Sequence, residues 1–376
     1  MDIRFSEAQE ILRKMVRDFL ATECPKAKVR ELEESEKGYS PELWKKMAEL
    51  GWMGLIIPDE YEGMGYTFQD LAVLLEEAGK NVLPGPLFCT TVSIFPILDS
   101  GTEEQKKEFL PKIARGELIL TTAHLESSGT FNASGVTIKA VPKGNDFIIN
   151  GTKLFVEMAN VADYLICTTR TTDGASPEEG ITLFMIEANS AGISCEVIPT
   201  IGMDKLCEVK FDNVAVPKKN MIGKLDQGWP IVEKIIGKGA IAKCAESIGG
   251  MQACVETTVA YTKERVQYNK SIGSFQALQH IMADMWVAVE TSRYIVYETA
   301  WMESEGIDCT KEASMAKAYV SEAYKYVTKW AIRLHGGIGT SRDHDIPLYH
   351  RRAKAADTAF GSTAYHRELV AQKIGL

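Results

Sequence analysis

Two adjacent glycines in the segment HGGIG, Gly336 and Gly337, could bring the backbone close to a bound phosphate group. Glycine has no Cβ, so the chain can approach a ligand there more closely than at other residues. Taken alone, however, paired glycines more often form the C-cap of a helix. The pair indicates a cofactor-binding turn only if further residues of such a site accompany it.

The cysteines and the net charge narrow the chemistry. None of the eight cysteines belongs to a CxxC pair, so we expect reduced, structural thiols. A formal net charge of −9 opposes binding to nucleic acid or to an anionic membrane, although a local basic pocket can still bind a charged small molecule. No window approaches the roughly 18 apolar residues of a membrane span, and the N-terminus is amphipathic rather than a signal peptide. We therefore expect a cytoplasmic protein.

The elements that must position such residues fall into three blocks, which together predict an α+β fold. A length of 376 residues with 45% hydrophobic residues predicts two or three domains. Residues 1–118 show helical apolar spacing, residues 119–226 contain β-branched runs between turns, and residues 227–376 contain long helical stretches. We predict an N-terminal helical domain, a middle β domain and a C-terminal helical bundle. One face of the first helix is expected to consist of Ile11, Leu12, Met15, Val16, Phe19 and Leu20.

Five phrases in collinear order, spread over essentially the whole chain, resemble the acyl-CoA dehydrogenase family. They are IIPDEYEGMGYTFQD, GTEEQKKEFLPKIARGE, FIINGTKLFVEMANVADYLI, FDNVAVPKKNMIGKLDQGW, and finally RVQYNKSIGSFQALQHIMADM with LHGGIGTSRDHDIPLYHRRAKA. The resemblance implies a flavin enzyme that holds FAD between the β domain and the C-terminal bundle of a tetramer. It also implies an acyl-CoA substrate and an electron-transferring flavoprotein as the electron acceptor.

In the C-terminal block, the resemblance assigns Arg265 to the FAD pyrophosphate of a neighbouring subunit, which suits a planar guanidinium facing phosphate oxygens. Gly336 and Gly337 are assigned to the same phosphates. Arg333 stands where relatives often carry glutamine, and either a phosphate contact or a solvated helix residue would explain it. The other positions that match cofactor contacts are Tyr268, Ile272, Phe275 and Gln276, although Tyr268-Asn269 departs from the usual Phe-Gly. A helix end followed by a connector is the alternative interpretation of this segment.

In the β block, the resemblance assigns Phe155 to the aromatic position that packs on the flavin, and Leu125 to the same cofactor-binding set. Glu157 matches a position that in relatives is often a threonine bonded to the reactive edge of the ring. Glu157 is therefore a catalytic candidate. A carboxylate that turns to solvent at a strand end is an equally good interpretation.

The implied reaction is α,β-dehydrogenation, in which a base removes the proton next to the thioester carbonyl as the β hydride passes to the flavin. Phe360, in the phrase AFGSTAYHREL, occupies the position usually held by the catalytic glutamate. Its backbone N–H can still contribute to the oxyanion site, so Phe360 remains a catalytic candidate. Its side chain, however, has no group that can act as a base.

A second family position for the glutamate lies on the first helix of the C-terminal bundle. Matching backward without gaps from Arg265 places it at Gly239, followed by Ala240, so this position is empty too. An alignment slip could still hide a base at Glu233 or Glu246, which lie within two turns of Gly239.

Three explanations for the missing acid stay open. We favour a cyclic substrate such as cyclohexene carboxyl-CoA, from which a displaced base would remove a proton at a different carbon. Relatives that act on this substrate lack the usual glutamate and use an aspartate after an LPGPL-type turn. This chain reads LPGPLFCTTVSIF there, which makes Thr91 a catalytic candidate, although a hydroxyl is a poor base and Thr90 is its alternative. Second, the chain could be one subunit of a heteromeric dehydrogenase whose partner supplies the base. Third, a decarboxylating or reductive role would need no base. A flavin- and acyl-CoA-binding scaffold without turnover is the alternative from another class.

Overall fold

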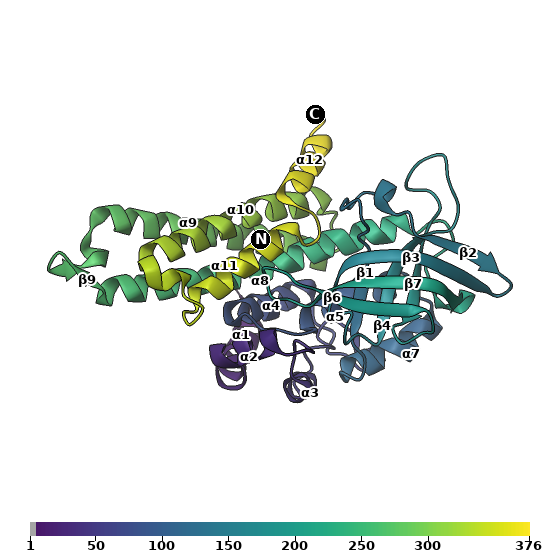
Figure 1. The fold of residues 1–376 in the computed structure, drawn as a ribbon, viewed down its shortest axis with the longest axis horizontal. Coiled ribbons are helices and arrows are strands. Elements are labelled where there is room, and N and C mark those ends of the chain that lie inside the picture. The colour runs from purple at the N-terminus through teal and green to yellow at the C-terminus, as the bar shows by residue number, and fades with distance from the viewer. Residues whose placement is uncertain (1–4) are drawn as a thin grey trace. The chain divides into compact units, whose positions relative to one another are not determined.

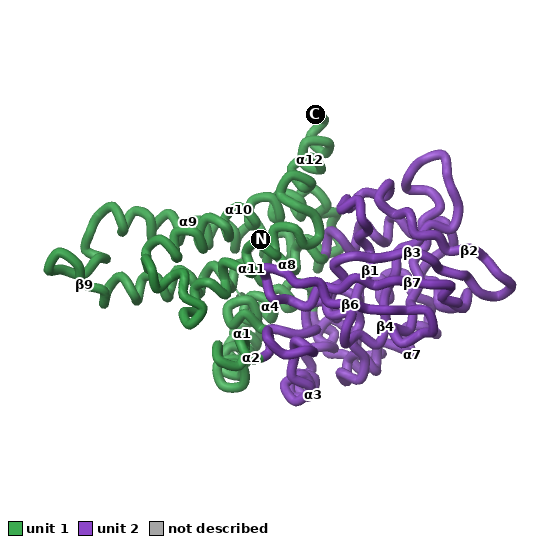
Figure 2. Tube along the Cα trace, in the orientation of Figure 1, with its two compact units in different colours: residues 1–31, 67–83, 239–376 green, residues 32–66, 84–238 purple. Residues whose placement is uncertain are grey.

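The computed structural model describes residues 5–376 (Figure 1). The described residues form two compact units, coloured separately in Figure 2. The bundle unit comprises residues up to 31, residues 67–83 and residues 239–376, and the sheet unit comprises residues 32–66 and 84–238. The N-terminal helical block of the sequence is therefore divided between both units.

Long helices build the bundle unit, and α10 packs against α9, α11 and α12. The helices α2 and α8 each continue across a boundary between the units. The elements with residues in this unit are α1 (Glu7–Glu23), α2 (Lys26–Glu34), α4 (Phe68–Asn81), α8 (Trp229–Glu264), β9 (Val266–Gln267), β10 (Lys270–Ser271), η4 (Ile272–Ser274), α9 (Gln276–Ser304), α10 (Thr310–His335), η5 (Gly336–Thr340), α11 (Ile346–Thr358) and α12 (Thr363–Lys373).

Helix α1 begins at a capping box, in which Ser6 Oγ accepts from the Gln9 backbone and the Gln9 side chain accepts from the Ser6 N–H. Its buried face is narrower than the sequence predicts. Leu12, Val16 and Leu20 are buried, whereas Ile11 is 61% exposed. The buried row runs from Gln9 through Leu12, Val16 and Leu20 in steps of three and four residues, and Ile11 and Met15 lie beside that line.

Glycines let α4 and α8 cross with their backbones in near contact. A Cβ on Gly79 would lie 1.9 Å from the carbonyl oxygen of Glu246, and one on Gly249 would lie 1.8 Å from that of Glu76. No side chain larger than hydrogen fits at either position. The two glycines therefore set the separation of these helices.

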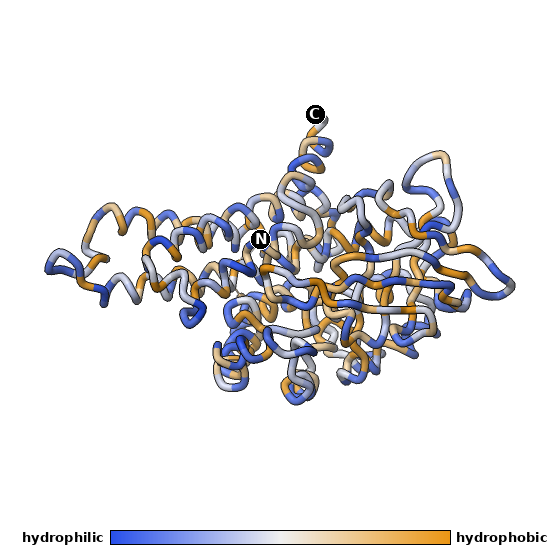
Figure 3. The backbone as a smooth tube through the Cα atoms, viewed as in Figure 1, coloured by the Kyte–Doolittle hydropathy of each residue, from blue (hydrophilic) through white to orange (hydrophobic). Residues whose placement is uncertain are grey.

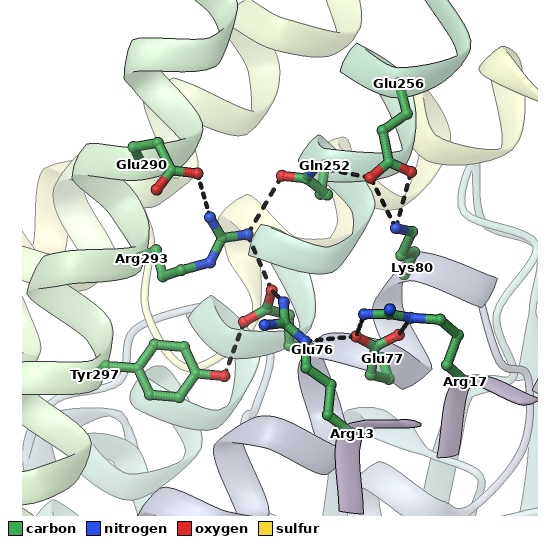
Figure 4. Close-up of polar contacts among 10 residues, drawn as sticks. All are labelled: Arg13, Arg17, Glu76, Glu77, Lys80, Gln252, Glu256, Glu290, Arg293 and Tyr297. Carbon is green, nitrogen blue, oxygen red and sulfur yellow. Dashed lines mark hydrogen bonds and ion pairs between the residues drawn. The ribbon is translucent and has the colours of Figure 1, made fainter. Parts of the chain in front are cut away.

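A buried ionic network ties α1, α4 and α9 together beside that crossing (Figure 4). The Glu76 carboxylate, 2% exposed, accepts from Arg13 Nη2 at 3.0 Å, Arg293 Nη2 at 3.0 Å and the Tyr297 hydroxyl at 2.8 Å. The neighbouring Glu77 carboxylate accepts from Arg13 Nε at 2.9 Å. Because several donors converge on each buried carboxylate, the charges are compensated inside the unit.

The sheet unit contains an eight-stranded sheet in the order β6-β7-β3-β2-β4-β5-β8, with β1 paired to β4. Its strands are β1 (Leu120–Ala123), β2 (Lys139–Lys143), β3 (Asp146–Glu157), β4 (Tyr164–Arg170), β5 (Ile181–Glu187), β6 (Ile193–Ile198), β7 (Leu206–Pro217) and β8 (Met221–Ile222). Its helices are α3 (Pro41–Glu49), η1 (Asp59–Tyr61), α5 (Leu87–Ser93), α6 (Phe95–Ser100), α7 (Glu103–Ala114), η2 (Ala133–Gly135) and η3 (Lys218–Asn220).

Alternation along β3 and β7 explains the core of the sheet. Phe147 and Ile149 on β3, and Val209 and Phe211 on β7, are buried, and residues between them face outward. Figure 3 shows hydrophilic stretches interrupting the hydrophobic ones along the helices of the bundle unit. Among the described residues, no helix has the length and apolar character needed to cross a membrane.

The predicted fold class is confirmed, because helical, β and helical segments follow one another along the chain as expected. Helix α7 ends at Ala114 before β1, and β8 ends at Ile222 before α8. The predicted domain boundaries at 118 and 226 remain a prediction, since the compact units group the chain differently.

Candidate functional site

The turn between α11 and α12 carries Phe360, the residue at the position of the missing glutamate. Helix α11 ends at Thr358, and α12 begins after its N-cap Ser362, whose Oγ accepts from the Tyr365 N–H. Phe360 has φ +54° and Gly361 has φ +100°. A left-handed phenylalanine is uncommon, so contacts around the turn must hold it there.

The Phe360 ring lies directly against Gly239 of α8. A Cβ on Gly239 would lie 2.3 Å from two ring atoms of Phe360. The two positions that the sequence resemblance assigns to a catalytic glutamate are therefore neighbours in this chain, and the ring occupies the space in front of Gly239. Of the two slip candidates, Glu233 is exposed, and Glu246 forms an ion pair of 2.6 Å with Lys243.

Two buried side chains that the sequence interpretation missed hold this turn. Lys317 Nζ, on α10, donates to the carbonyl oxygens of Ala356 at 2.9 Å, Asp357 at 3.1 Å and Gly361 at 3.0 Å. Burial lowers the pKa of Lys317 to about 8, so the ammonium form still predominates at pH 7. On α12, His366 lies with Nε2 2.8 Å from the Phe360 carbonyl oxygen.

A polar signal for Lys317 does exist in the sequence. Residues 313, 316, 320 and 324 form the buried stripe of α10, and position 317 falls within it. A lysine in an apolar stripe predicts a buried cation, but spacing alone does not give its partners.

The Arg265 segment forms an exposed hairpin at the far end of α8 from Gly239 (Figure 1). Strands β9 and β10 pair antiparallel around a two-residue turn, in which Tyr268 has φ +53° and Asn269 has φ +62°. Two consecutive positive φ values are typical of a type I′ hairpin turn. Arg265 is exposed and Tyr268 is 87% exposed, so the hairpin presents these side chains outward.

The other predicted contacts of this segment lie close to the hairpin. Ile272 lies in η4, Phe275 is the N-cap residue of α9, and Gln276 begins that helix. The Phe275 ring packs edge-on to Tyr268, with centroids 6.2 Å apart. The structure thus brings the predicted hairpin residues together, but keeps them away from Phe360.

The helix rise gives that separation. From Gly239 to Arg265 the chain is helical to residue 264, which at 1.5 Å per residue corresponds to about 39 Å. Single ligand pockets have volumes of about 300–1,000 Å³, and a roughly spherical pocket of the larger volume is only about 12 Å across. Arg265 and Phe360 of one chain therefore cannot line the same pocket.

The structure of Gly336 and Gly337 is consistent with both interpretations that the sequence allows, a helix C-cap and a close approach of the backbone to a phosphate. Gly336 is the C-cap residue of α10, with φ +65°. A Cβ on Gly336 or Gly337 would meet no described atom within 4 Å, so the space in front of both is open. Arg333, in the last turn of α10, is exposed and lies over the Trp330 ring at 4.6 Å.

In the sheet unit, a bulge presents Phe155. The β3–β7 register shifts between Lys153 and Val156, and Phe155 has φ +55° and is 48% exposed. The neighbouring Leu154 N–H donates to the Leu125 carbonyl oxygen at 2.8 Å, so the chain places Leu125 beside this bulge.

Glu157 follows at the end of β3 and is half-buried. Thr121 Oγ1 donates to its backbone carbonyl oxygen at 2.6 Å. This contact fixes the strand end and leaves both interpretations of the carboxylate open.

A buried ion pair, also missed from the sequence, supports the bulge. Lys153 Nζ donates to Glu126 at 2.7 Å and to the His124 carbonyl oxygen at 3.0 Å. Burial alone would raise the pKa of Glu126, but Lys153 and hydrogen bonds from Thr137 and Ile138 hold it below its ordinary value. Glu126 is therefore an ionised structural group.

Thr91 does not have the geometry of a base. Its hydroxyl lies 2.9 Å from the Leu87 carbonyl oxygen and 3.0 Å from that of Phe88, and the residue is 1% exposed. A hydroxyl that donates to its own helix gains no proton affinity from these acceptors. Thr90 likewise donates to the Leu120 carbonyl oxygen, at 3.3 Å.

The residues present fit FAD in each unit taken by itself. The open backbone at Gly336 and Gly337 would accommodate a pyrophosphate, and the adjacent His335 has a buried Nε2 with no hydrogen-bond partner among the described residues. In the sheet unit, the exposed Phe155 ring offers a surface for an aromatic ring system.

Comparison with known proteins identifies the family. Profiles of the acyl-CoA dehydrogenase N-terminal, middle and C-terminal domains match residues 6–117, 122–214 and 226–375. The short-chain specific acyl-CoA dehydrogenase of Clostridium acetobutylicum is 33% identical, with all of both chains covered. The caffeyl-CoA reductase-Etf complex subunit CarC of Acetobacterium woodii is 30% identical over 97% of each chain.

A solved structure of a variant of the Tcur3481-Tcur3483 steroid ACAD superposes with a TM-score of 0.88 at 27% identity, over 98% of each chain. The chain therefore belongs to the acyl-CoA dehydrogenase family, FAD-dependent oxidoreductases that act on a CH–CH bond.

Proposed function

We propose that this chain is a subunit of a heteromeric acyl-CoA dehydrogenase in which another chain carries the carboxylate that removes the α-proton. The observation that supports the proposal is the contact of the Phe360 ring with Gly239, which leaves an apolar surface at both positions used for the base. A carboxylate in an apolar pocket can have the raised pKa that proton abstraction needs, whereas a phenyl ring cannot accept a proton.

The dehydrogenation forms a double bond between Cα and Cβ while the α-hydrogen leaves as a proton and the β-hydrogen leaves with two electrons. When bound, FAD supplies the acceptor for that hydride. The backbone N–H of Phe360 would orient and polarise the thioester carbonyl, which stabilises the negative charge that develops on its oxygen. The Phe360 ring would exclude water from the α-carbon and contact the acyl group.

Two of the predicted cofactor contacts, Phe155 and Leu125, would pack against the ring system of FAD from this chain. Gly336 and Gly337 would approach the pyrophosphate of a neighbouring subunit's cofactor together with Arg265, since His335 packs on Tyr261 at that end of α8. Arg265 would reach the pyrophosphate of a neighbouring subunit, because it lies too far from Phe360 to act in its own site. This requirement supports an oligomer, and we propose a tetramer.

A cyclic acyl group is the second candidate, and it is compatible with either source of the base. The aromatic surface at Phe360 favours it, because a ring packs well against a ring. The steroid ACAD with the same fold is named for a substrate class made of fused rings. Since the hydroxyls of Thr90 and Thr91 donate to backbone carbonyls, a displaced base would have to come from another residue.

The electron acceptor and the location are proposals based on the family and the sequence. We propose an electron-transferring flavoprotein as acceptor, supported by the relative that is a subunit of a reductase-Etf complex. A cytoplasmic location stays a prediction.

A gain-of-function variant tests the missing base. Phe360→Glu restores a carboxylate at the end of α11, and Phe360→Gln has the same shape without a base. Each FAD-loaded protein is titrated anaerobically with butanoyl-CoA and with cyclohex-1-ene-carbonyl-CoA, and the oxidised flavin absorbance is followed.

With butanoyl-CoA we expect no bleaching with the native chain alone or with Phe360→Gln, and bleaching with Phe360→Glu. Cyclohex-1-ene-carbonyl-CoA has no α-hydrogen, so it reports only a base that removes a proton from another carbon. General base catalysis contributes about 10²–10⁴-fold, so the difference between the variants should be large. Rapid bleaching by the native chain alone would overturn the proposal that another chain supplies the base. If the native chain alone were bleached only by the cyclic thioester, a displaced base in this chain would replace the base of a partner chain as the explanation.

A further inference from the structure

The turn that carries Phe360 needs support that its own sequence does not provide. Phe360 adopts φ +54°, a conformation that residues other than glycine rarely adopt. The following Gly361, with φ +100°, accommodates its own bend without strain. A phenylalanine keeps this left-handed backbone conformation only where several independent contacts hold it in place.

Lys317 is the first of these supports. The residue is 1% exposed, and its ammonium donates to the carbonyl oxygens of Ala356, Asp357 and Gly361, all between 2.9 and 3.1 Å away. The Ser321 hydroxyl, one turn further along α10, lies 3.1 Å from the same nitrogen and shares its three donors. Two of these carbonyls belong to the last turn of α11, where no intrahelical partner exists, and the third lies after Phe360. One cation thus joins the residues before and after Phe360.

His366 is the second support. Because a carbonyl oxygen can only accept, the 2.8 Å contact with Phe360 requires a proton on Nε2. Nδ1 then accepts from the Ser314 hydroxyl at 3.2 Å, since burial lowers the pKa of His366 to about 4 and keeps the ring neutral. Ser314 lies on α10 one turn before Lys317, so one helix fixes both supports.

We propose that Lys317 and His366 are positioning residues for the thioester carbonyl, acting through the backbone N–H of Phe360. This inference rests on the proposed function, in which that N–H polarises the carbonyl. The peptide that carries the N–H lies between the α11 end held by Lys317 and the Phe360 carbonyl held by His366. Both of its ends are therefore fixed, and its direction follows from them.

Paired ligands separate positioning from general stability. S-butyl-CoA and S-cyclohexylmethyl-CoA are thioethers that lack the carbonyl of butanoyl-CoA and cyclohexanecarbonyl-CoA but keep every other group. The dissociation constants of each thioester and its thioether are measured with the FAD-loaded protein by calorimetry. Their ratio reports the carbonyl contact alone.

The variants are Lys317→Met, which keeps the length without the charge, and Lys329→Met as control, because Lys329 is exposed on the same helix. In the native protein the thioester should bind about fivefold more tightly than the thioether, as expected for one hydrogen bond. Lys317→Met should bring the ratio close to one with thioether affinity unchanged. The control should keep the native ratio.

If Lys317→Met does not fold, His366 gives the same test. His366→Gln keeps a donor near the Nε2 position and should keep most of the ratio, whereas His366→Leu should lose it. A full native ratio in Lys317→Met, or in His366→Leu, would overturn the positioning role. A native protein that does not distinguish thioester from thioether, or binds neither pair, would instead overturn the carbonyl contact of the proposed function and the inference with it.

Discussion

At the scale of single residues, the chemistry of this chain depends on one contact, that of the Phe360 ring with Gly239. The glycine is needed because any Cβ would lie 2.3 Å from the ring. The aromatic ring of Phe360 thus excludes a side chain at position 239. If both are the base positions that the resemblance assigns, the absence of a carboxylate at one is coupled through space to its absence at the other.

A double-mutant cycle checks this coupling. In the native background Gly239→Ala should lower the free energy of unfolding by about 1–3 kcal/mol, because the added methyl overpacks the ring. In a Phe360→Ala background the same change should raise it by about 0.5–1 kcal/mol, because alanine is the better helix former. The measurement is thermal unfolding of all four proteins. Equal effects in both backgrounds would show that the two positions do not touch.

The sequence singles out both residues of this pair, Phe360 and Gly239. It does not reveal the side chains that hold the Phe360 turn in place. The C-terminal phrase assigned Phe360 to one position of the glutamate and matching without gaps from Arg265 assigned Gly239 to the other, and the structure brings the two together. Lys317 and His366 escaped because their partners are backbone carbonyls, which no side-chain pattern reveals. The catalytic role of Thr91 stays a prediction, and its hydrogen bonds to Leu87 and Phe88 give no support for a base there.

At the scale of elements, the bundle unit depends on carboxylates of α4 that lie between arginines from other helices. The Glu76 carboxylate accepts hydrogen bonds from Arg13 on α1 and from Arg293 and Tyr297 on α9 (Figure 4). Periodicity predicts that α4 has a buried face, but it assigns charged residues to the surface. The apolar pattern therefore could not predict the ionic network. It also could not predict that Ile11 on α1 is exposed.

Removing one carboxylate of the network should destabilise the bundle unit strongly. Glu76→Gln leaves two guanidinium groups facing a neutral amide, and loss of one partner of a buried pair costs about 3–5 kcal/mol. Glu256→Gln is the matched control, because the Glu256 side chain is 46% exposed in its pair with Lys80 and such pairs contribute about 0–1 kcal/mol. Chemical denaturation of the native protein and the two variants gives the free energy of unfolding of each. Similar losses of this free energy in both variants would contradict a special role of the buried network.

At the scale of the whole molecule, the length of α8 separates two halves of a cofactor site. Gly239 lies near one end and Arg265 directly follows the other, so about 39 Å of helix lies between them. The sequence resemblance assigned Arg265 to the cofactor of a neighbouring subunit. The continuous helix agrees with that assignment, because one chain cannot use both residues for the same ligand. In the proposed oligomer, a second copy or a related chain would bring its hairpin to the site.

This separation makes FAD retention depend on assembly as well as on Arg265. Arg265→Ala should release FAD, because the pyrophosphate loses a guanidinium that forms charge-assisted hydrogen bonds of about 1.5–3 kcal/mol. Lys263→Ala removes an equally exposed cation two residues away and should retain FAD. In the native protein, dilution that dissociates the assembly should release FAD together with the loss of oligomer, as followed by flavin fluorescence and light scattering. FAD that stays bound to a monomer, or to Arg265→Ala at native affinity, would show that the hairpin does not contribute to the site.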